Sequence, residues 1–213
     1  IGSFNKEVNV KMRLKGDRKI HYENLETASF RIKIKADNKL FGMKLFSIQK
    51  PRSRNYLGEW CFNKMMEDEG IISPRYEFIN VIINGKNCGI YAMEEHYAKE
   101  LIENNNNKEG PIIRFSESSS VYFKEATIEP FKATKWNEKE NFPLAEKAIN
   151  LLEAFRSNRL KISQVFDVKK MAMFFAIADL NDARHGLVTK SIRLYYNPIT
   201  SRLEPIPFDG HTG

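Results

Sequence analysis

The sequence predicts an α+β fold in which an N-terminal antiparallel sheet precedes a largely helical C-terminal part. Polar and apolar residues alternate near the N-terminus, as they do in half-buried strands. An Asn-Gly pair joins two apolar runs before the middle of the chain. Apolar residues recur at helical spacing from Pro143 onward. Because strands come first and helices later, we expect an α+β arrangement, which could form two lobes with a cleft between them.

The first elements are predicted to be three strands and a helix. Residues 9–15 and 30–35 alternate Lys or Arg with apolar side chains, which predicts two half-buried strands. Residues 41–48 are predicted to form a third strand after a turn at residues 37–38. Residues 56–69 place their apolar side chains on one helical stripe, and Gly70 is a typical residue for ending such a helix.

A hairpin is the clearest local prediction. Asn84 and Gly85 both tolerate positive φ, and they separate predicted strands at residues 76–83 and 88–93. A helix is expected directly after it, over residues 94–103.

The second half is predicted to be mainly helical. A short strand at residues 111–115, a serine-rich loop at 116–120 and an irregular stretch at 124–140 lead to a helix that begins near Pro143. Asp167 is a good N-cap for the next helix, which ends near residues 180–182. Residues 191–196 and 202–206 are predicted to form a hairpin after it.

Composition sets limits on the function. The 213 residues suit one domain, or one domain with two lobes, and no run of about 18 apolar residues could span a membrane. The net charge of +7 suits nucleic acid, phosphorylated ligands or anionic surfaces without choosing among them. The two cysteines and four dispersed histidines do not form a zinc motif. Residues 209–213 have the composition of a loop, so we expect the natural chain to continue past them.

Two aspartates are the first candidates for chemistry. Asp182 follows an apolar helix, Asp209 follows a strand, and the hairpin between them can bring both to one mouth of the domain. Phosphoryl transfer needs one carboxylate at the acceptor hydroxyl and another to hold magnesium on the phosphates. The alternative is structural: Asp182 caps or turns the chain, and residues 209–210 form an ordinary turn.

Basic residues of the N-terminal part are the complementary candidates. Lys33 and Lys44 are expected on strands, and Lys50, Arg52 and Arg54 follow in a loop. A lysine on a strand can hold a phosphate as a point charge, and an arginine can bind one bidentately. The alternative is that these charges coat an exposed sheet face. The sequence has neither a GxxxxGK[ST] nor a GxGxxG phosphate loop.

Several stretches, taken in order, resemble the CotH family, whose founding members are spore-coat proteins with atypical protein kinase activity. The most specific runs over residues 81–95 (VIINGKNCGIYAMEE) and is similar to the family's NGxyxGxYxlxE pattern. The other stretches are residues 10–17, 29–34, 41–48, 56–70, 193–196 and 205–209, together with Asp182.

The resemblance implies an atypical kinase-like fold of two lobes, with approximate bounds 1–115 and 116–213. It also implies ATP, Mg²⁺ or Mn²⁺, and a protein hydroxyl of Ser, Thr or Tyr as acceptor. Asp182 would lie at the acceptor hydroxyl, and Asp209 would bind the metal. Lys33 or Lys44 would contact phosphates, and we add Arg52 and Glu94 to the predicted nucleotide-binding residues.

Departures from the family pattern keep a second function open. Phe208 replaces a tryptophan, His211 replaces a second aspartate, and residues 190–191 are Lys-Ser where an asparagine is expected. Since Mg²⁺ prefers oxygen ligands, His211 predicts weaker metal binding. The alternative is a catalytically inactive binding or structural module of a coat or cell-surface assembly, and an exported, surface or spore-coat location is expected. Nucleic-acid binding rests on charge alone and is not favoured, because no motif for base recognition is present.

Overall fold

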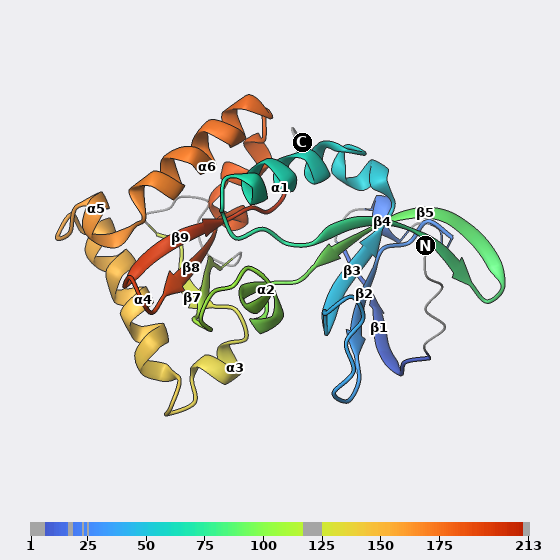
Figure 1. The fold of residues 1–213 in the computed structure, drawn as a ribbon, viewed down its shortest axis with the longest axis horizontal. Helices are drawn as coiled ribbons and strands as arrows, with labels where there is room; N and C mark the ends of the chain where they lie inside the picture. Colours follow the sequence, from blue (N-terminus) through green and yellow to red (C-terminus); the bar gives the residue numbers. More distant parts are fainter. Residues whose placement is uncertain (1–6, 17–18, 23, 25, 117–124, 211–213) are drawn as a thin grey trace. The chain divides into compact units, whose positions relative to one another are not determined.

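The computed structural model describes residues 7–16, 19–22, 24, 26–116 and 125–210, and within them it contains two antiparallel sheets and six α-helices (Figure 1). The α+β class expected from the sequence is confirmed. The chain divides into two compact units, which we call unit 1 (residues 1–53 and 75–96) and unit 2 (residues 54–74 and 97–213). Both units draw on separate stretches of sequence, and the continuous lobes 1–115 and 116–213 stay a prediction.

Unit 1 is built on a five-stranded sheet with the order β1-β2-β3-β5-β4 and antiparallel pairing throughout. Its strands are β1 (Val10–Leu14), β2 (Phe30–Ile34), β3 (Leu45–Gln49), β4 (Tyr76–Ile83) and β5 (Lys86–Glu95). Asn84 and Gly85 adopt φ of 50° and 79° in the β4–β5 turn, which is why the Asn-Gly pair predicted this hairpin correctly. Short 3₁₀ helices, η1 (Lys19–His21) and η2 (Pro51–Arg54), follow β1 and β3.

One face of this sheet carries the core of unit 1. Phe30, Phe46, Ile48 and Met93 are buried there. The edge strand β1 differs from the expectation of a half-buried strand, because its apolar residues Val10, Met12 and Leu14 are 40–51% exposed. An edge strand has a neighbour on one side alone, so its apolar face is covered less completely than that of β3.

Unit 2 is built on a four-stranded antiparallel sheet with the order β7-β6-β8-β9. Its strands are β6 (Ile112–Phe115), β7 (Ile128–Pro130), β8 (Arg193–Asn197) and β9 (Arg202–Ile206). Its helices are α1 (Gly58–Asp68), α2 (Lys99–Asn104), α3 (Ala133–Trp136), α4 (Phe142–Arg156), α5 (Ile162–Val165) and α6 (Val168–Leu180), with 3₁₀ turns η3 (Arg184–Leu187) and η4 (Thr189–Ser191).

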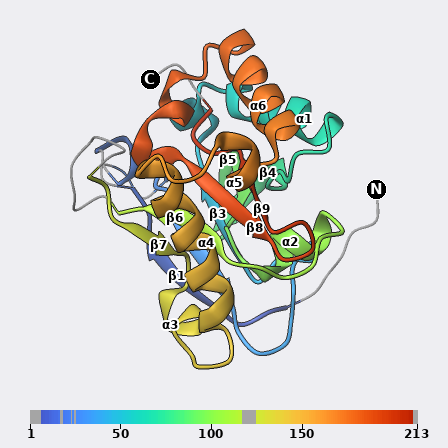
Figure 2. The ribbon, with the colours of Figure 1, turned by 90° about the vertical axis from the view of Figure 1, so that its left-hand side faces the viewer.

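Helices cover unit 2 in two places. Helix α4 lies across one face of the sheet (Figure 2), where Ala148 and Leu152 belong to the same buried cluster as Leu194 and Leu203. Helices α1 and α6 pack against each other, with the rings of Phe62 and Phe174 6.2 Å apart and edge to face. None of the helices in the described ranges is both long and apolar enough to cross a membrane.

Some local expectations were wrong. The helix expected over residues 94–103 starts at Lys99, because β5 continues to Glu95, which pairs with Phe46 of β3. The stretch expected to be irregular contains β7 and α3. The third strand starts at Leu45, after a turn in which Phe41 and Gly42 have positive φ. The serine-rich loop expected at residues 116–120 lies outside the described residues, apart from Ser116. His211 also lies outside them.

Candidate functional site

Asp209 lies in a buried turn of unit 2, three residues after the end of β9. It is 8% exposed, and its φ of 60° is uncommon for a residue other than glycine. The next residue fixes this turn against α1: a Cβ added to Gly210 would lie 2.0 Å from Phe62 Cδ1. Only glycine therefore fits beside Asp209 without a shift of α1 or of the turn.

Two basic side chains contact the Asp209 carboxylate. Arg54 forms an ion pair with Oδ1, and His185 Nδ1 lies 2.8 Å from Oδ2. Both side chains of the Arg54–Asp209 pair are about nine-tenths buried. Arg54 was one of the arginines expected to hold a phosphate. In this structure it instead neutralises the carboxylate that the sequence predicted as a metal ligand.

Asp182 terminates helix α6. The N–H of Asp182 donates to the carbonyl of Asp179, and the N–H of Ala183 donates to that of Ala178, which together form a Schellman motif. Asp182 occupies the left-handed position of this motif, with φ 49°. The cap explains its backbone and leaves its carboxylate exposed, where Oδ1 accepts a 2.6 Å hydrogen bond from Arg184 Nε. Asp182 therefore has the capping role that the structural alternative expected, and its carboxylate is still accessible to solvent.

The segments that carry the two aspartates meet through His185 and Gly186. His185 follows Asp182 by three residues and contacts Asp209. A Cβ on Gly186 would lie 3.0 Å from the carbonyl oxygen of Phe208, so η3 packs closely on the Asp209 turn. Three residues of extended chain span at most about 10 Å, which limits how far Asp182 lies from the residue that touches Asp209.

Unit 1 contains a cation held by a buried acid. Lys15 Nζ donates to Glu94 Oε2 at 3.0 Å and to Gln49 Oε1 at 3.2 Å, and Gln49 Nε2 donates to the same Glu94 oxygen at 2.9 Å. Glu94 and Gln49 are 5% and 0% exposed. The ammonium group is therefore held in one position on the sheet, as a fixed charge for an anion requires.

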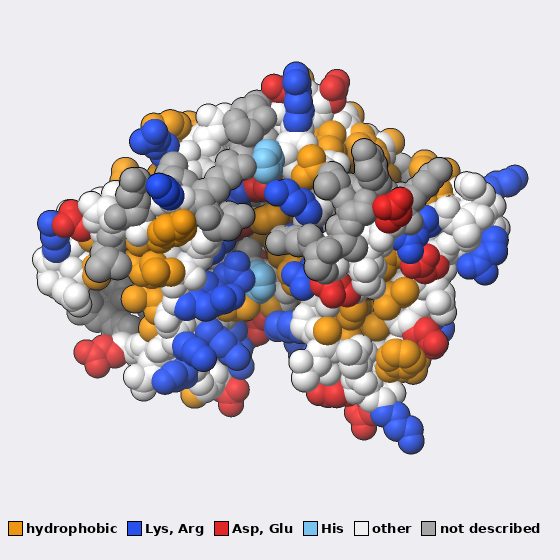
Figure 3. Space-filling model, turned by 180° about the vertical axis from the view of Figure 1, so that it is seen from behind, with side chains coloured by type: hydrophobic (Ala, Val, Ile, Leu, Met, Phe, Trp, Pro, Cys, Tyr) orange, Lys and Arg blue, Asp and Glu red, His pale blue; other side chains and the backbone are white. Residues whose placement is uncertain are grey.

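Four more cations share a face of the unit 1 sheet. Lys11 of β1 lies opposite Lys33 of β2, and Arg13 lies opposite Arg31. Lys and Arg side chains gather over the part of the surface that β1 to β3 form (Figure 3). Like charges directly opposite each other destabilise a sheet. We call Lys11, Arg13, Arg31 and Lys33 the basic face. These four side chains therefore do not stabilise one another across the strand pair.

The remaining predicted cations have other surroundings. Lys44 Nζ lies 3.2 Å from Asp37 Oδ1 at the surface, and Arg52 is exposed in η2. Of the predicted nucleotide-binding residues, Lys33 lies in the basic face and Glu94 in the contact with Lys15.

The sequence did not single out Lys15, Gln49 or His185 for these roles. Lys15 and Glu94 are 79 positions apart, so no local pattern links them. The sequence could have indicated His185, because a histidine three residues after a candidate aspartate falls in the same loop.

Asp209 fits a metal ion whose other ligands are mostly phosphates and water. Among the residues that the structure describes, no three His, Cys, Asp or Glu side chains are grouped to hold a metal. Mg²⁺ commonly uses one or two protein carboxylates together with substrate phosphates and water, and Asp209 meets that smaller requirement. Arg54 and His185 occupy its oxygens, so both compete with a metal at this carboxylate.

The fold and these two groups of residues define a kinase-like α+β protein, with a cation-bearing antiparallel sheet in unit 1 and a buried aspartate after a strand in unit 2. A family model described as CotH kinase protein matches residues 12–211, nearly the whole chain, and the protein belongs to the CotH kinase family. No curated protein matches the chain.

Proposed function

We propose that this protein is an atypical ATP-dependent kinase that transfers the γ-phosphoryl group to a hydroxyl of a protein acceptor. The observation that carries the proposal is the meeting of the Asp182 and Asp209 segments through His185. Phosphoryl transfer uses one carboxylate at the acceptor hydroxyl and another at the metal ion, and these two segments each carry one. Family membership supports kinase-like chemistry in general.

The residues would divide the chemistry as follows. The acceptor oxygen forms a bond to the γ-phosphorus while the bond from that phosphorus to the ADP oxygen breaks, and Asp182 takes the hydroxyl proton. Within unit 1, the candidates to bind phosphate oxygens are Lys15, which Glu94 and Gln49 hold, and Lys33 of the basic face. Asp209 would supply a protein oxygen to Mg²⁺ or Mn²⁺. The metal would neutralise charge on the phosphate oxygens.

The first experiment is a calorimetric titration with ATP, with and without Mg²⁺ or Mn²⁺. We expect metal-dependent binding that Asp209→Ala abolishes. Lys15→Gln should weaken binding roughly tenfold, because it removes a charge-assisted contact, whereas Lys147→Gln on the exposed side of α4 should leave it unchanged. Lys44→Gln and Arg52→Gln test the other predicted cations, and exposed charges predict smaller losses.

Turnover tests the role of Asp182. Asp182→Asn should lower phosphoryl transfer about 100-fold or more, because it removes the base without changing the size of the side chain. Asp179→Asn is the matched control, since Asp179 is an exposed aspartate in the last turn of the same helix. Equal rates for the parent and Asp182→Asn would refute this role.

The second candidate function is a non-catalytic binding module. The contacts of Arg54 and His185 with both Asp209 oxygens favour it, because a metal has to displace at least one of them. It predicts no phosphorylated product with any acceptor. Product that depends on Asp209 would exclude it.

A further inference from the structure

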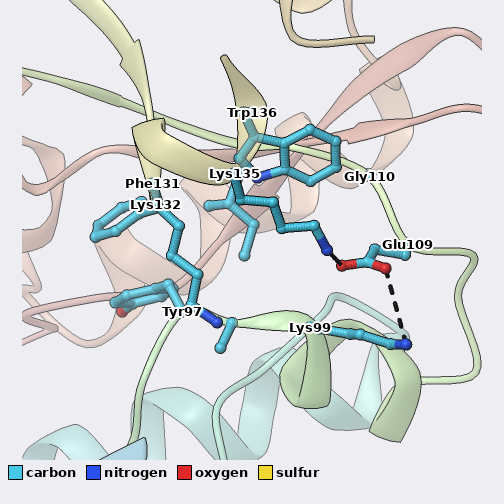
Figure 4. Close-up of a pocket in the computed structure, with 10 residues that line it drawn as sticks. Tyr97, Lys99, Glu109, Gly110, Phe131, Lys132, Lys135 and Trp136 are labelled. Carbon is cyan, nitrogen blue, oxygen red and sulfur yellow. Dashed lines mark hydrogen bonds and ion pairs between the residues drawn. The ribbon is translucent and has the colours of Figure 1, made fainter. Parts of the chain in front are cut away.

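Two hollows of unit 2 differ in size and in what their side chains already contact. The pocket between α2 and α3 is small, about 20 Å³, and its lysines are paired with carboxylates of the protein itself (Figure 4): Lys135 with Glu109, and Lys99 with Glu103 and Glu109. A groove between α1 and α6 is larger, at about 370 Å³. That volume lies within the range of about 300–1,000 Å³ that is typical of ligand sites. We call it the α1–α6 groove.

The walls of the α1–α6 groove come from the sides of two helices that pack side by side (Figure 1). Met65 of α1 lines one wall, and Met173, Ile177 and Leu180 of α6 line the other. Because the backbone groups of both helices are bonded within the helices, the groove offers side chains to a ligand and no free strand edge. Methionine side chains are flexible and polarizable, so they adapt to apolar ligands of different shapes.

Helix α6 has the composition of a buried helix but is not covered on every side. Residues 171–178 are eight consecutive apolar residues (MAMFFAIA). A helix that is apolar all round is normally enclosed by other elements. Ala176, in the wall of the groove, is nevertheless exposed, and Leu180 is 74% exposed. An apolar surface left open in this way is typical of an interaction site.

Two carboxylates lie at the rim of the groove. Asp68 is the last residue of α1 and Glu69 is its C-cap, and both are exposed. Within the described ranges of the chain neither forms an ion pair, whereas their neighbour Glu67 pairs with Lys64 at 2.6 Å. The last turn of α1 contains no basic residue, and negative charges at a helix C-terminus oppose the helix dipole. These two carboxylates therefore do not stabilise α1 and can pair with the cations of a ligand.

We propose that the α1–α6 groove is a docking site for an amphipathic helix of a partner protein, with leucine-like side chains on one face and Lys or Arg beside them. The apolar side chains fill the groove between Met65 and Met173, and the cations pair with Asp68 and Glu69. Helices that bind in grooves use apolar residues at helical spacing as anchors. Charge complementarity at the rim selects a basic helix over an acidic one. This interaction goes beyond the proposed function and requires neither nucleotide nor catalysis.

A labelled peptide tests the binding. The probe is a helical peptide with Leu at positions i, i+3, i+4 and i+7 and Lys between them. One control peptide has Glu in place of Lys, and the other has Ser in place of Leu. Fluorescence anisotropy with the whole chain and without ATP should show saturable binding of the Leu–Lys peptide, and binding at least about tenfold weaker for either control. Added salt should weaken the binding, because it screens exposed charges.

Methionine methyl groups show where the peptide binds. The chain has seven methionines, few enough for each methyl signal to be assigned by NMR in protein with isotope-labelled methionine. The signals of Met65 and Met173, which line the groove, should shift as the peptide is added. Those of Met43 and Met93, which are buried in the core of unit 1, should stay in place.

A charge variant tests the rim. Asp68→Asn combined with Glu69→Gln should weaken binding of the Leu–Lys peptide about threefold to tenfold, since it removes two exposed ion pairs with the ligand. It should keep or raise the melting temperature, because it removes negative charge from a helix C-terminus. Glu140→Gln combined with Glu146→Gln removes the same charge from exposed positions outside the groove and should bind like the parent.

An apolar variant tests the wall. Leu180→Ala should weaken binding about fivefold to tenfold, because it removes apolar surface that the peptide buries. Its side chain is mostly exposed in the free protein, so the variant should remain folded. Ile199→Ala, at a side chain 75% exposed in the turn between β8 and β9, is the matched control and should bind like the parent.

The proposal fails if the parent does not bind the Leu–Lys peptide, if the Glu peptide binds equally well, or if each groove variant binds like its control. Unchanged signals of Met65 and Met173 at saturation would also overturn it. If the chain self-associates in analytical ultracentrifugation and Leu180→Ala abolishes this while the peptide does not compete, a second copy occupies the groove and the proposal is wrong. Since phosphoryl transfer enters none of these measurements, the docking site and the proposed function can fail independently.

Discussion

At the scale of single residues, the pair of Arg54 and Asp209 concentrates opposite charges in a poorly hydrated place, with side chains 10% and 11% exposed. If one partner of such a pair is removed, the other charge stays buried, where neither an opposite charge nor bulk water stabilises it. The pair therefore links the stability of unit 2 to the residues proposed for metal binding.

We expect Arg54→Met to lower the free energy of unfolding by about 3 kcal/mol, the usual cost of breaking a buried ion pair. Asp209→Asn should also destabilise, and the double variant should lose less than the two single losses combined. Urea unfolding without nucleotide measures all three. Strict additivity would mean that the ion pair contributes no coupling energy.

The contact of Lys15 with Glu94 shows what a sequence pattern cannot predict. Asp182 and Asp209 were identifiable because each follows a recognisable helix or strand. Lys15 was read only as a polar strand residue, since its partner Glu94 is reached through the pairing of distant strands. Local patterns report neighbours along the chain and not contacts across a sheet.

At the scale of elements, capping residues predicted where helices end more reliably than helix propensity predicted where they begin. Asp167 and Gly70 mark helix ends in the structure as they did in the sequence. The helix expected over residues 94–103 was wrong at its start because Glu94 and Glu95, good helix formers, pair with β3 instead. Tertiary pairing outweighs propensities of a few tenths of a kcal/mol per residue.

Helix α6 offers a test of its capping. Asp167 Oδ1 accepts a 3.1 Å hydrogen bond from the backbone N–H of Lys170. Asp167→Ala should cost about 1 kcal/mol, because this helical N–H then loses its acceptor. Asp179→Ala is the matched control, since a negative charge in the last turn opposes the helix dipole and its removal should be neutral or slightly stabilising. Thermal unfolding distinguishes the two, and equal melting temperatures would contradict the cap.

At the scale of the whole molecule, the order of strands and helices was enough to predict an α+β fold, but not how the chain is divided. Helix α1 lies between β3 and β4 in sequence and belongs to unit 2, with a core that includes Phe174 and Ile177 of α6. The place of α1 in unit 2 depends on contacts between residues that are more than a hundred positions apart in the sequence. The sequence pattern of α1 predicts an apolar stripe and not its partner.

The stability of the whole protein should depend on alkaline pH through Tyr195. This side chain is fully buried on β8, and its hydroxyl donates to the carbonyl of Lys108. Burial raises the pKa of Tyr195, and the nearby charge of Glu204 raises it further. A raised pKa in the folded state favours the neutral phenol. Its contribution to stability is therefore complete below the unfolded pKa of about 10 and is lost as pH rises above that value.

Tyr195→Phe tests this dependence. At pH 7 the variant should be less stable by about 1 kcal/mol, because it loses the hydrogen bond to Lys108. Above pH of about 10 only the parent must keep this phenol protonated, so the difference between the two should shrink. Tyr56→Phe, at a side chain 60% exposed, is the control and should differ from the parent by a constant amount. Urea unfolding from neutral to alkaline pH measures each difference, and a Tyr195→Phe gap that stays constant or widens would show that burial of this phenol does not limit alkaline stability.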